Sequence, residues 1–259
     1  MFVVLHHIKA QRANLQQTHY LVSATPVFAA VMLGHAIAAR LGKRDLGVGI
    51  VHHSASPHIE YIPNTNGRIS GLPCQFRGAT AADHNQRTRP TQNAVQPAVT
   101  GDLDVSLVLR IEDGPDMSDV RREIASMGVR LAGGKVPRPP RILEADDLPS
   151  AIRMCGRGYW VSDATQTVRD RLADGMPIIE AIMGRVAGGW HVPATLGYRA
   201  LTRFEQRPGA RDGLDHAYSE PVVGLVRYNS VFSLGRDDAP PLALWSHRWI
   251  TDSMFVVHQ

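Results

Sequence analysis

Apolar residues at every second position between Asp102 and Glu112 form the clearest pattern in the chain. A period of two residues predicts a half-buried β-strand. The apolar runs Phe2–Lys9 and Asp45–Ser54 are rich in β-branched residues and predict two further strands. The apolar positions of the alternating stretch, which all fall on one face, are Leu103, Val105, Leu107, Leu109 and Ile111.

Helical periodicity separates the first two strands. After Pro26, apolar residues recur at steps of three and four as far as Leu41, which predicts a helix. Ser23 or Thr25 can cap its start, and Gly42 can end it.

A second, shorter helix is predicted from Val120 to Met127, with Asp116 or Ser118 as its cap. It leads into a strand that begins at Gly128. The order over residues 2–136 is therefore β-α-β-insertion-β-α-β. This order predicts an α+β, ferredoxin-like fold, which is also the frame of the RNA recognition motif. In that frame the first strand lies beside the third and the fourth, and the face without helices stays open to a ligand.

The last of these strands, Gly128–Val136, bends at the pair Gly133-Gly134, directly before Lys135. Backbone N–H groups exposed at such a bend, beside a cation, can bind a phosphate group. A P-loop requires Ser or Thr after its lysine, and Val136 has no hydroxyl to hold magnesium. The stretch therefore does not predict an NTPase. A plain glycine bend that closes a sheet edge remains the alternative.

The pattern divides the chain at about residue 140. Residues 1–140 form the predicted ferredoxin-like domain, with a long insertion at 55–101 between its second and third strands. Residues 141–259 form a smaller C-terminal α+β region packed on it. Its predicted elements are helices at 163–174 and 178–186, a turn region rich in Gly and aromatic residues at 188–198, and strands at 220–231, 242–250 and 255–257.

Composition adds few constraints. The net charge of +4 permits an anionic partner, and Lys9, Lys43 and Lys135 are the only lysines among 28 basic residues. Arginine suits bidentate contact with phosphate. Two cysteines are too few for a disulfide framework, which favours a reducing cytoplasm. The apolar stretch Tyr20–Ala39 contains Pro26 and polar residues, so it predicts a buried helix and no membrane span.

The twelve histidines raise the question of a metal or of acid–base chemistry. Adjacent pairs at 6–7 and 52–53 fall on strands that the predicted order does not make neighbours, and no metal-binding spacing occurs. We expect no metal and no cofactor. His7, His35 or His84 could act as a general base in metal-free RNA cleavage, but the sequence pairs none of them with a partner.

The chain resembles the Cas-five-type subunits, the Csy-two family, of type I-F or variant type I-F CRISPR surveillance complexes. The resemblance is carried, in order along the chain, by residues 8–14, 47–52, 127–136, 189–193 with 197–198, and 245–249. The third predicted strand has no Phe or Tyr, so stacking of bases on the sheet, as in an ordinary RNA recognition motif, is not expected. The chain is shorter than typical members, and its second half has few of their insertions.

The resemblance implies a non-catalytic cytoplasmic protein that holds the 5′ handle of the crRNA. It also implies contact with the Cas-eight-type large subunit and with a Cas-seven-type backbone subunit, and it leaves contact with target DNA open. The family's insertion between strands two and three is a thumb, which corresponds here to residues 55–101. The RNA-binding residues expected from the resemblance and the pattern together are Lys9, Gln11, Arg12, Asn14, Arg77, Arg87, Arg89, Arg130, Gly133, Gly134 and Lys135.

Two other functions fit the same sequence. One is a metal-independent CRISPR endoribonuclease that processes precursor crRNA, for which a histidine would be essential. The other is an assembly subunit with little direct RNA contact, which would copurify with partners without binding RNA alone.

Overall fold

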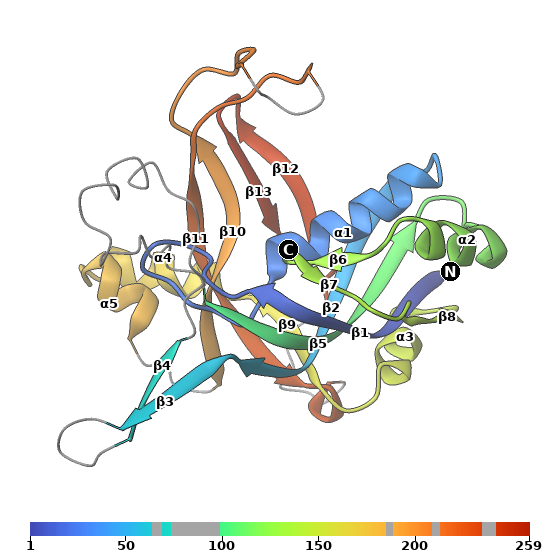
Figure 1. Ribbon diagram of the computed structural model, residues 1–259, viewed down its shortest axis with the longest axis horizontal. Helices are drawn as coiled ribbons and strands as arrows, with labels where there is room; N and C mark the ends of the chain where they lie inside the picture. Colours follow the sequence, from blue (N-terminus) through green and yellow to red (C-terminus); the bar gives the residue numbers. More distant parts are fainter. Residues whose placement is uncertain (64–68, 74–98, 185–188, 209–212, 235–241) are drawn as a thin grey trace, which may run out of the picture.

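The computed structural model describes residues 1–63, 69–73, 99–184, 189–208, 213–234 and 242–259 (Figure 1). Within these residues eleven strands form one antiparallel sheet. They are β1 (Phe2–Asn14), β2 (Asp45–Pro57), β5 (Thr100–Ile111), β6 (Arg130–Leu131), β7 (Gly134–Lys135), β8 (Arg141–Ala145), β9 (Tyr159–Asp163), β10 (Trp190–Ala200), β11 (Ser219–Ser230), β12 (Ser246–Thr251) and β13 (Met254–His258). Their order is β12-β13-β10-β11-β9-β2-β5-β1-β7-β6, and β8 also pairs with β1.

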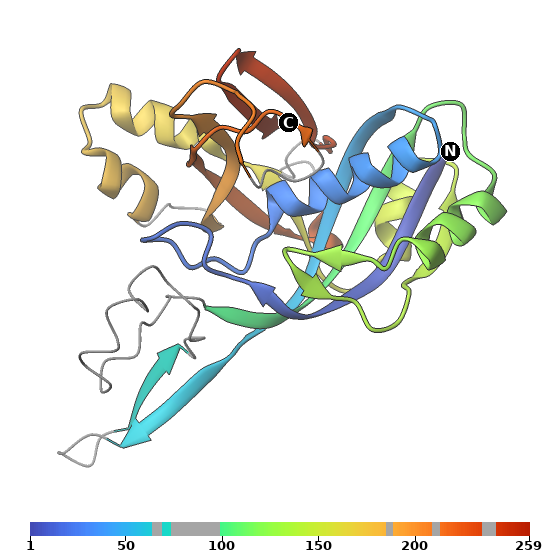
Figure 2. The ribbon, with the colours of Figure 1, turned by 45° about the horizontal axis from the view of Figure 1, so that its top comes forward.

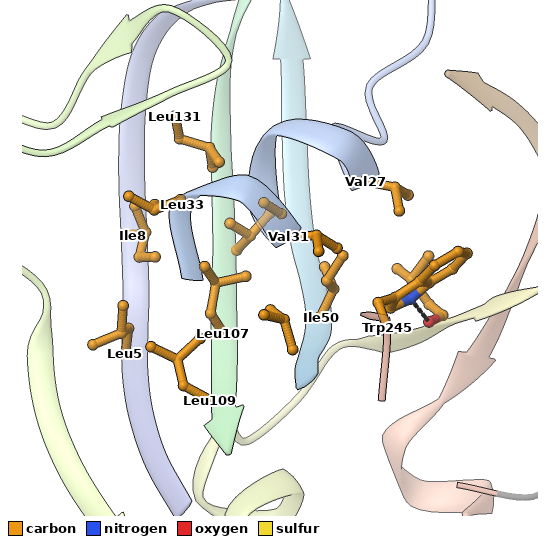
Figure 3. Packing of buried hydrophobic residues seen from close by; sticks show 14 of the residues in the cluster. Leu5, Ile8, Val27, Val31, Leu33, Ile50, Leu107, Leu109, Leu131 and Trp245 are labelled. Atoms are coloured by element: carbon orange, nitrogen blue, oxygen red, sulfur yellow. Dashed lines mark hydrogen bonds between the residues drawn. The ribbon is translucent and has the colours of Figure 1, made fainter. Parts of the chain in front are cut away.

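The helices cover both faces of this sheet. They are α1 (Val27–Arg40), α2 (Met117–Ser126), α3 (Leu148–Met154), α4 (Thr165–Ala173) and α5 (Ile178–Met183), and a short 3₁₀ turn, η3, spans Val231–Ser233. Helices α1 and α2 pack on the face that carries the alternating apolar residues of β5, and α1 lies across that face (Figures 2 and 3). On the opposite face, Ala151 and Ile152 of α3 pack against Val4, Val108 and Trp160.

The predicted ferredoxin-like α+β fold is wrong. The structure is mostly antiparallel sheet, with 45% of residues in strands and 24% in helices, and the sheet curls into a half-barrel. The C-terminal strands do not form a smaller α+β unit of their own. Instead, β9 pairs with β2 and extends the sheet from that edge. Apolar periodicity is a local signal, and it does not indicate which sheet edge a later strand joins.

Several individual elements are confirmed. Strand β5 and helix α1 lie where the periodicity predicts them. Helix α2 is present but begins three residues earlier than predicted, at Met117, and Asp116 caps it by accepting a hydrogen bond of 2.6 Å from the Ser118 N–H. Strand β1 does lie between β5 and β7. The predicted cap of α1 is wrong, because Pro26 occupies the N-cap position and no side chain caps the helix.

The second half of the chain differs more from expectation. The region at 188–198 that was expected to be turns contains the start of β10, which begins at Trp190. Strands β8 and β9 and helix α3 were not predicted. All three are short, between five and seven residues, and a short apolar run gives no clear period.

The expected insertion at 55–101 is partly described. Strand β2 continues to Pro57, and β3 (Ile59–Pro63) pairs with β4 (Ile69–Pro73) in a hairpin that projects away from the body (Figure 2). Strand β5 begins again at Thr100. Residues 64–68 and 74–98 lie outside the described part of the chain.

The sheet curls far enough to bring the segment before β12 back to β2. Val48 and Trp245 exchange two backbone hydrogen bonds of 2.8 Å each. The indole of Trp245 is fully buried, and its Nε1 donates to the Val161 carbonyl at 2.9 Å (Figure 3). Among the described residues, no helix is long and apolar enough to cross a membrane.

A buried histidine makes the stability of this fold depend on pH. His52 is 7% exposed and packs edge-on against Tyr228, and burial lowers its pKa to about 4. The unfolded chain, with an ordinary pKa of about 6.5, binds the proton first as the pH falls. The contribution of His52 to stability is therefore complete above pH ~6.5 and is lost progressively between pH ~6.5 and pH ~4.

We expect His52→Phe to reduce the loss of unfolding free energy between pH 7.5 and pH 5.0 by about 2 kcal/mol. Urea unfolding at the two pH values measures this difference. The control His19→Gln removes an exposed histidine and should leave the dependence on pH as it is in the wild type. If the unfolding free energy of His52→Phe fell with pH as much as that of the wild type, the pH dependence could not be attributed to His52.

Candidate nucleic-acid interface

Strand β1 and the β6–β7 hairpin form one edge of the sheet. Gln11 pairs with Lys135, and the Asn14 N–H donates to the Ala132 carbonyl at 2.8 Å. The hairpin turns at Ala132 and Gly133, whose φ angles are +49° and +76°. Two successive positive φ angles are typical of the type I′ turn that suits a two-residue hairpin. The bend predicted from the glycine pair is therefore a hairpin turn.

Gly134 is required at this edge by close packing of two backbones. A Cβ at this position would lie 2.8 Å from the Ala13 Cα and N and 2.8 Å from the Gln11 carbonyl oxygen. These atoms belong to the main chain and cannot move aside as a flexible side chain would. A Cβ on Gly133, in contrast, would meet no atom within 4 Å. Gly134 thus sets the distance between β7 and β1, and Gly133 forms the turn.

A bulge in β1 shapes the surface beside this hairpin. The pairing of β1 with β5 shifts between Ala10 and Ala13, and Arg12 has a φ of +53°. The Arg12 N–H donates to Asp102 Oδ1 at 3.0 Å, and His58 Nε2 lies 3.3 Å from the same oxygen. An open pocket of about 360 Å³ results, and it is lined by Gln11, Arg12, His58, Asp102, Gly133 and Lys135.

The cations of this edge, Arg12, Arg130 and Lys135, are exposed. Arg130 and Lys135 face one another across the hairpin as a cross-strand pair. Like charges in this arrangement repel each other, and an anion between them would relieve the repulsion. We call this surface the basic edge. It consists of Gln11, Arg12, Asn14, Arg130, Gly133, Gly134 and Lys135.

Lys9 lies on the face of the sheet that α1 and α2 do not cover. It pairs with Asp104 across β1 and β5, and cross-strand partners share a face. The structure thus brings together eight of the expected RNA-binding residues, from two segments far apart in the sequence. Arg77, Arg87 and Arg89, together with His84, lie outside the described residues.

Next to Lys9, the same face carries a cluster of polar groups that the sequence did not reveal. His7 Nδ1 lies 2.7 Å from Asp104 Oδ1, and His53 Nε2 lies 2.7 Å from Ser106 Oγ. The rings of His7 and His53 stack over β5 with centroids 4.1 Å apart, although β1 and β2 are not neighbours. This contact depends on irregularities in both strands, because His7 has a φ of +55° and β2 shifts register between His52 and Ser54.

The hydrogen bonds show which nitrogen of each ring donates and which accepts. His53 Nδ1 lies 2.6 Å from the Arg157 carbonyl and must donate to it, so its Nε2 accepts from Ser106. His7 Nδ1 donates to Asp104, which leaves its Nε2 as a base. Burial first, and the charge of His7 second, lower the pKa of His53. The His7 side chain is 36% exposed and can reach a ligand, whereas Ser106 is fully buried and cannot serve as a nucleophile.

The alternation of β5 already placed Asp104 and Ser106 on its polar face, so these residues could have been predicted as neighbours. The two bulges that turn His7 and His53 toward them leave no signal in the sequence, since neither involves glycine or proline. Comparison with known proteins adds nothing to this assignment, because no family model and no curated protein matches the chain.

The two glycines should respond differently to substitution. We expect Gly134→Ala to cost about 1–3 kcal/mol of unfolding free energy, because its Cβ would overlap backbone atoms of β1. Gly133→Ala meets open space, and its strained φ should cost about 1 kcal/mol. Urea unfolding measures both values. An equal or smaller cost for Gly134→Ala would show that β7 is not held closely against β1.

Proposed function

We propose that this chain is a non-catalytic RNA-binding subunit that holds the 5′ handle of a guide RNA in a CRISPR surveillance complex. The observation that carries the proposal is the basic edge itself. Gln11, Arg12, Gly133 and Lys135 line one open pocket together with His58 and Asp102, and Arg130 is paired against Lys135 beside it. The resemblance to the Cas-five-type family supports the identity of the RNA and of the partners, the Cas-seven-type and Cas-eight-type subunits.

The geometry favours contact with the RNA backbone. Phosphate groups bind to cations and backbone N–H groups, and such contacts fix register without reading sequence. The basic edge offers Arg12, Arg130 and Lys135, and no Phe, Tyr or Trp lines its pocket to stack on a base. Gln11 and Asn14 are exposed amides at the same edge and can donate to or accept from base edges.

Removal of single cations tests the interface. Each phosphate contact on single-stranded RNA contributes about 0.7 to the slope of log affinity against log salt. We expect Arg12→Ala and Lys135→Ala each to reduce that slope by ~0.7 and to weaken binding. Fluorescence anisotropy with a guide RNA carrying its repeat-derived 5′ end, at several salt concentrations, measures the effect.

The matched control is Arg169→Ala, which removes an exposed cation from α4, away from the basic edge. It should leave the slope unchanged. The proposal fails if Arg12→Ala and Lys135→Ala both retain the wild-type affinity and slope. If the chain copurifies with partner proteins but does not bind RNA by itself, an assembly subunit is favoured instead.

One observation favours the endoribonuclease as a second candidate. His7, held by Asp104, presents an oriented Nε2 on the same face as Lys9. In metal-free cleavage such a base takes the proton from a 2′-hydroxyl, whose oxygen then attacks the adjacent phosphorus while the 5′ oxygen leaves with a proton from an acid. The next ring, His6, lies edge-on to His7 at 4.3 Å.

The two candidates make opposite predictions for precursor RNA incubated in EDTA. We expect no specific cleavage, because the proposed subunit only binds. The endoribonuclease predicts cleavage at one position that is abolished in His7→Ala, is reduced in Asp104→Asn and is retained in His19→Gln. Gel analysis of end-labelled RNA distinguishes the two outcomes, and cleavage that depends on His7 would overturn the binding-only proposal.

A further inference from the structure

A second cluster of histidine and carboxylate groups lies away from the basic edge. His35 comes from α1, Asp45 begins β2, and His247 belongs to β12. His35 Nδ1 lies 2.8 Å from Asp45 Oδ1, and His247 Nε2 lies 3.3 Å from Asp45 Oδ2. The two ring nitrogens are 3.1 Å apart. Three potential metal ligands thus point toward a common centre.

Regular secondary structure holds these three groups in place. The two backbone hydrogen bonds between Val48 and Trp245 fix the chain before His247 against β2, close to Asp45. Trp245 is fully buried, and the ring of Phe255 lies 5.5 Å from that of His247. The arrangement therefore does not depend on a loop.

The carboxylate of Asp45 is nearly buried. Its side chain is 7% exposed, and its ion-pair partners in the described part of the chain are the two imidazoles alone. A buried charge requires compensation, from a cation or from a metal ion. The two imidazoles supply that charge only if one of them is protonated.

Hydrogen bonding satisfies the three atoms only in part. If both ring nitrogens carry hydrogens, the two N–H groups face one another across 3.1 Å. If one of them is bare, it can accept from the N–H of the other ring, but its lone pair also faces a carboxylate oxygen that can only accept. A single cation at the centre resolves both conflicts, because each of the three atoms would then donate a lone pair to it.

We propose that His35 Nδ1, His247 Nε2 and the Asp45 carboxylate bind a divalent transition-metal ion, with Zn²⁺ as the preferred ion. Zinc binds imidazole nitrogen and carboxylate oxygen at about 2.0–2.2 Å in tetrahedral geometry, so its ligand atoms lie about 3.3 Å apart. The observed separations of 2.8 to 3.4 Å bracket that value. Three protein ligands leave the fourth position to water or to a ligand, and the His35 side chain, 47% exposed, opens the site to solvent.

The other histidine–carboxylate cluster is less suited to a metal. Both ring nitrogens of His53 are already hydrogen-bonded, to the Arg157 carbonyl and to Ser106 Oγ. A metal would have to displace one of these bonds. That cluster therefore provides a control within the same molecule.

A metal at this site would join helix α1 and strand β2 to the C-terminal strand β12. In the described residues, the two-bond bridge at Val48 and Trp245 is the backbone pairing between β2 and the segment leading into β12. Binding to the folded state only would stabilise the protein by mass action. The ion would thus hold β12 against α1 and β2 in the curled sheet.

The test uses the untagged full-length protein after treatment with EDTA, titrated with ZnCl₂ in a calorimeter. We expect one Zn²⁺ per chain and a higher melting temperature. His35→Ala and His247→Ala should each weaken binding by at least about tenfold. Loss of a residue that only hydrogen-bonds to a metal ligand already costs about tenfold in affinity, and loss of the ligand itself should cost no less. His7→Ala should bind Zn²⁺ as the wild type does.

Asp45→Asn should also weaken binding, but Asp45 is nearly buried, so this substitution can also disturb folding. His35→Ala lies on an exposed helix face and decides the question if Asp45→Asn does not fold. The absence of saturable binding, or wild-type affinity in both histidine variants, would overturn the proposal. Loss of binding in His7→Ala with retention in His35→Ala would assign the ion to the other cluster and would also overturn it.

Discussion

Pairing of β5 with both β1 and β2 is the constraint on which the rest of the structure depends. The alternation of β5 buries one face under α1 and α2, so both neighbours must match its period. Where they do not match, the extra residue bulges out of the ladder. These bulges fall at His7 and Arg12 in β1 and beside His53 in β2. The polar groups of the candidate sites therefore gather along β5 because its partners are irregular there.

The return of the C-terminal segment to β2 has an equally wide effect. It turns an open sheet into a half-barrel and buries Trp245 against Val161. It also brings His247 to Asp45 and His35, which are some two hundred residues away in the sequence. Long-range closure of this kind is decided by the packing of whole strands. The burial of Trp245 and the grouping of His35, Asp45 and His247 therefore both follow from this closure of the sheet.

The sequence could predict the elements whose periodicity is long and regular, and little of what joins them. Strand β5 and helix α1 were found because their apolar positions recur over ten residues or more, whereas the shorter helix α2 was found from the cap before it. The fold class could not be found, since no local pattern shows that β9 extends the sheet from β2. For the basic edge, the glycine pair placed the turn to within one residue, since the turn lies at Ala132 and Gly133 and Gly134 begins β7. The contact of His7 with His53 was not predictable, because a bulge at a histidine has no sequence signal.

The charges along β5 argue for where an RNA strand would lie. Asp102 and Asp104 are on the same face, and they would repel phosphate groups placed directly over the strand. Arg130 and Lys135 stand outside this line, on the hairpin, and Asp102 is the acidic residue that lines the pocket with Lys135. A polyanion is therefore favoured along the outer edge and disfavoured over the histidine pair. This distribution of charge supports a binding role for the edge over cleavage by His7, because the scissile phosphate would have to approach Asp104.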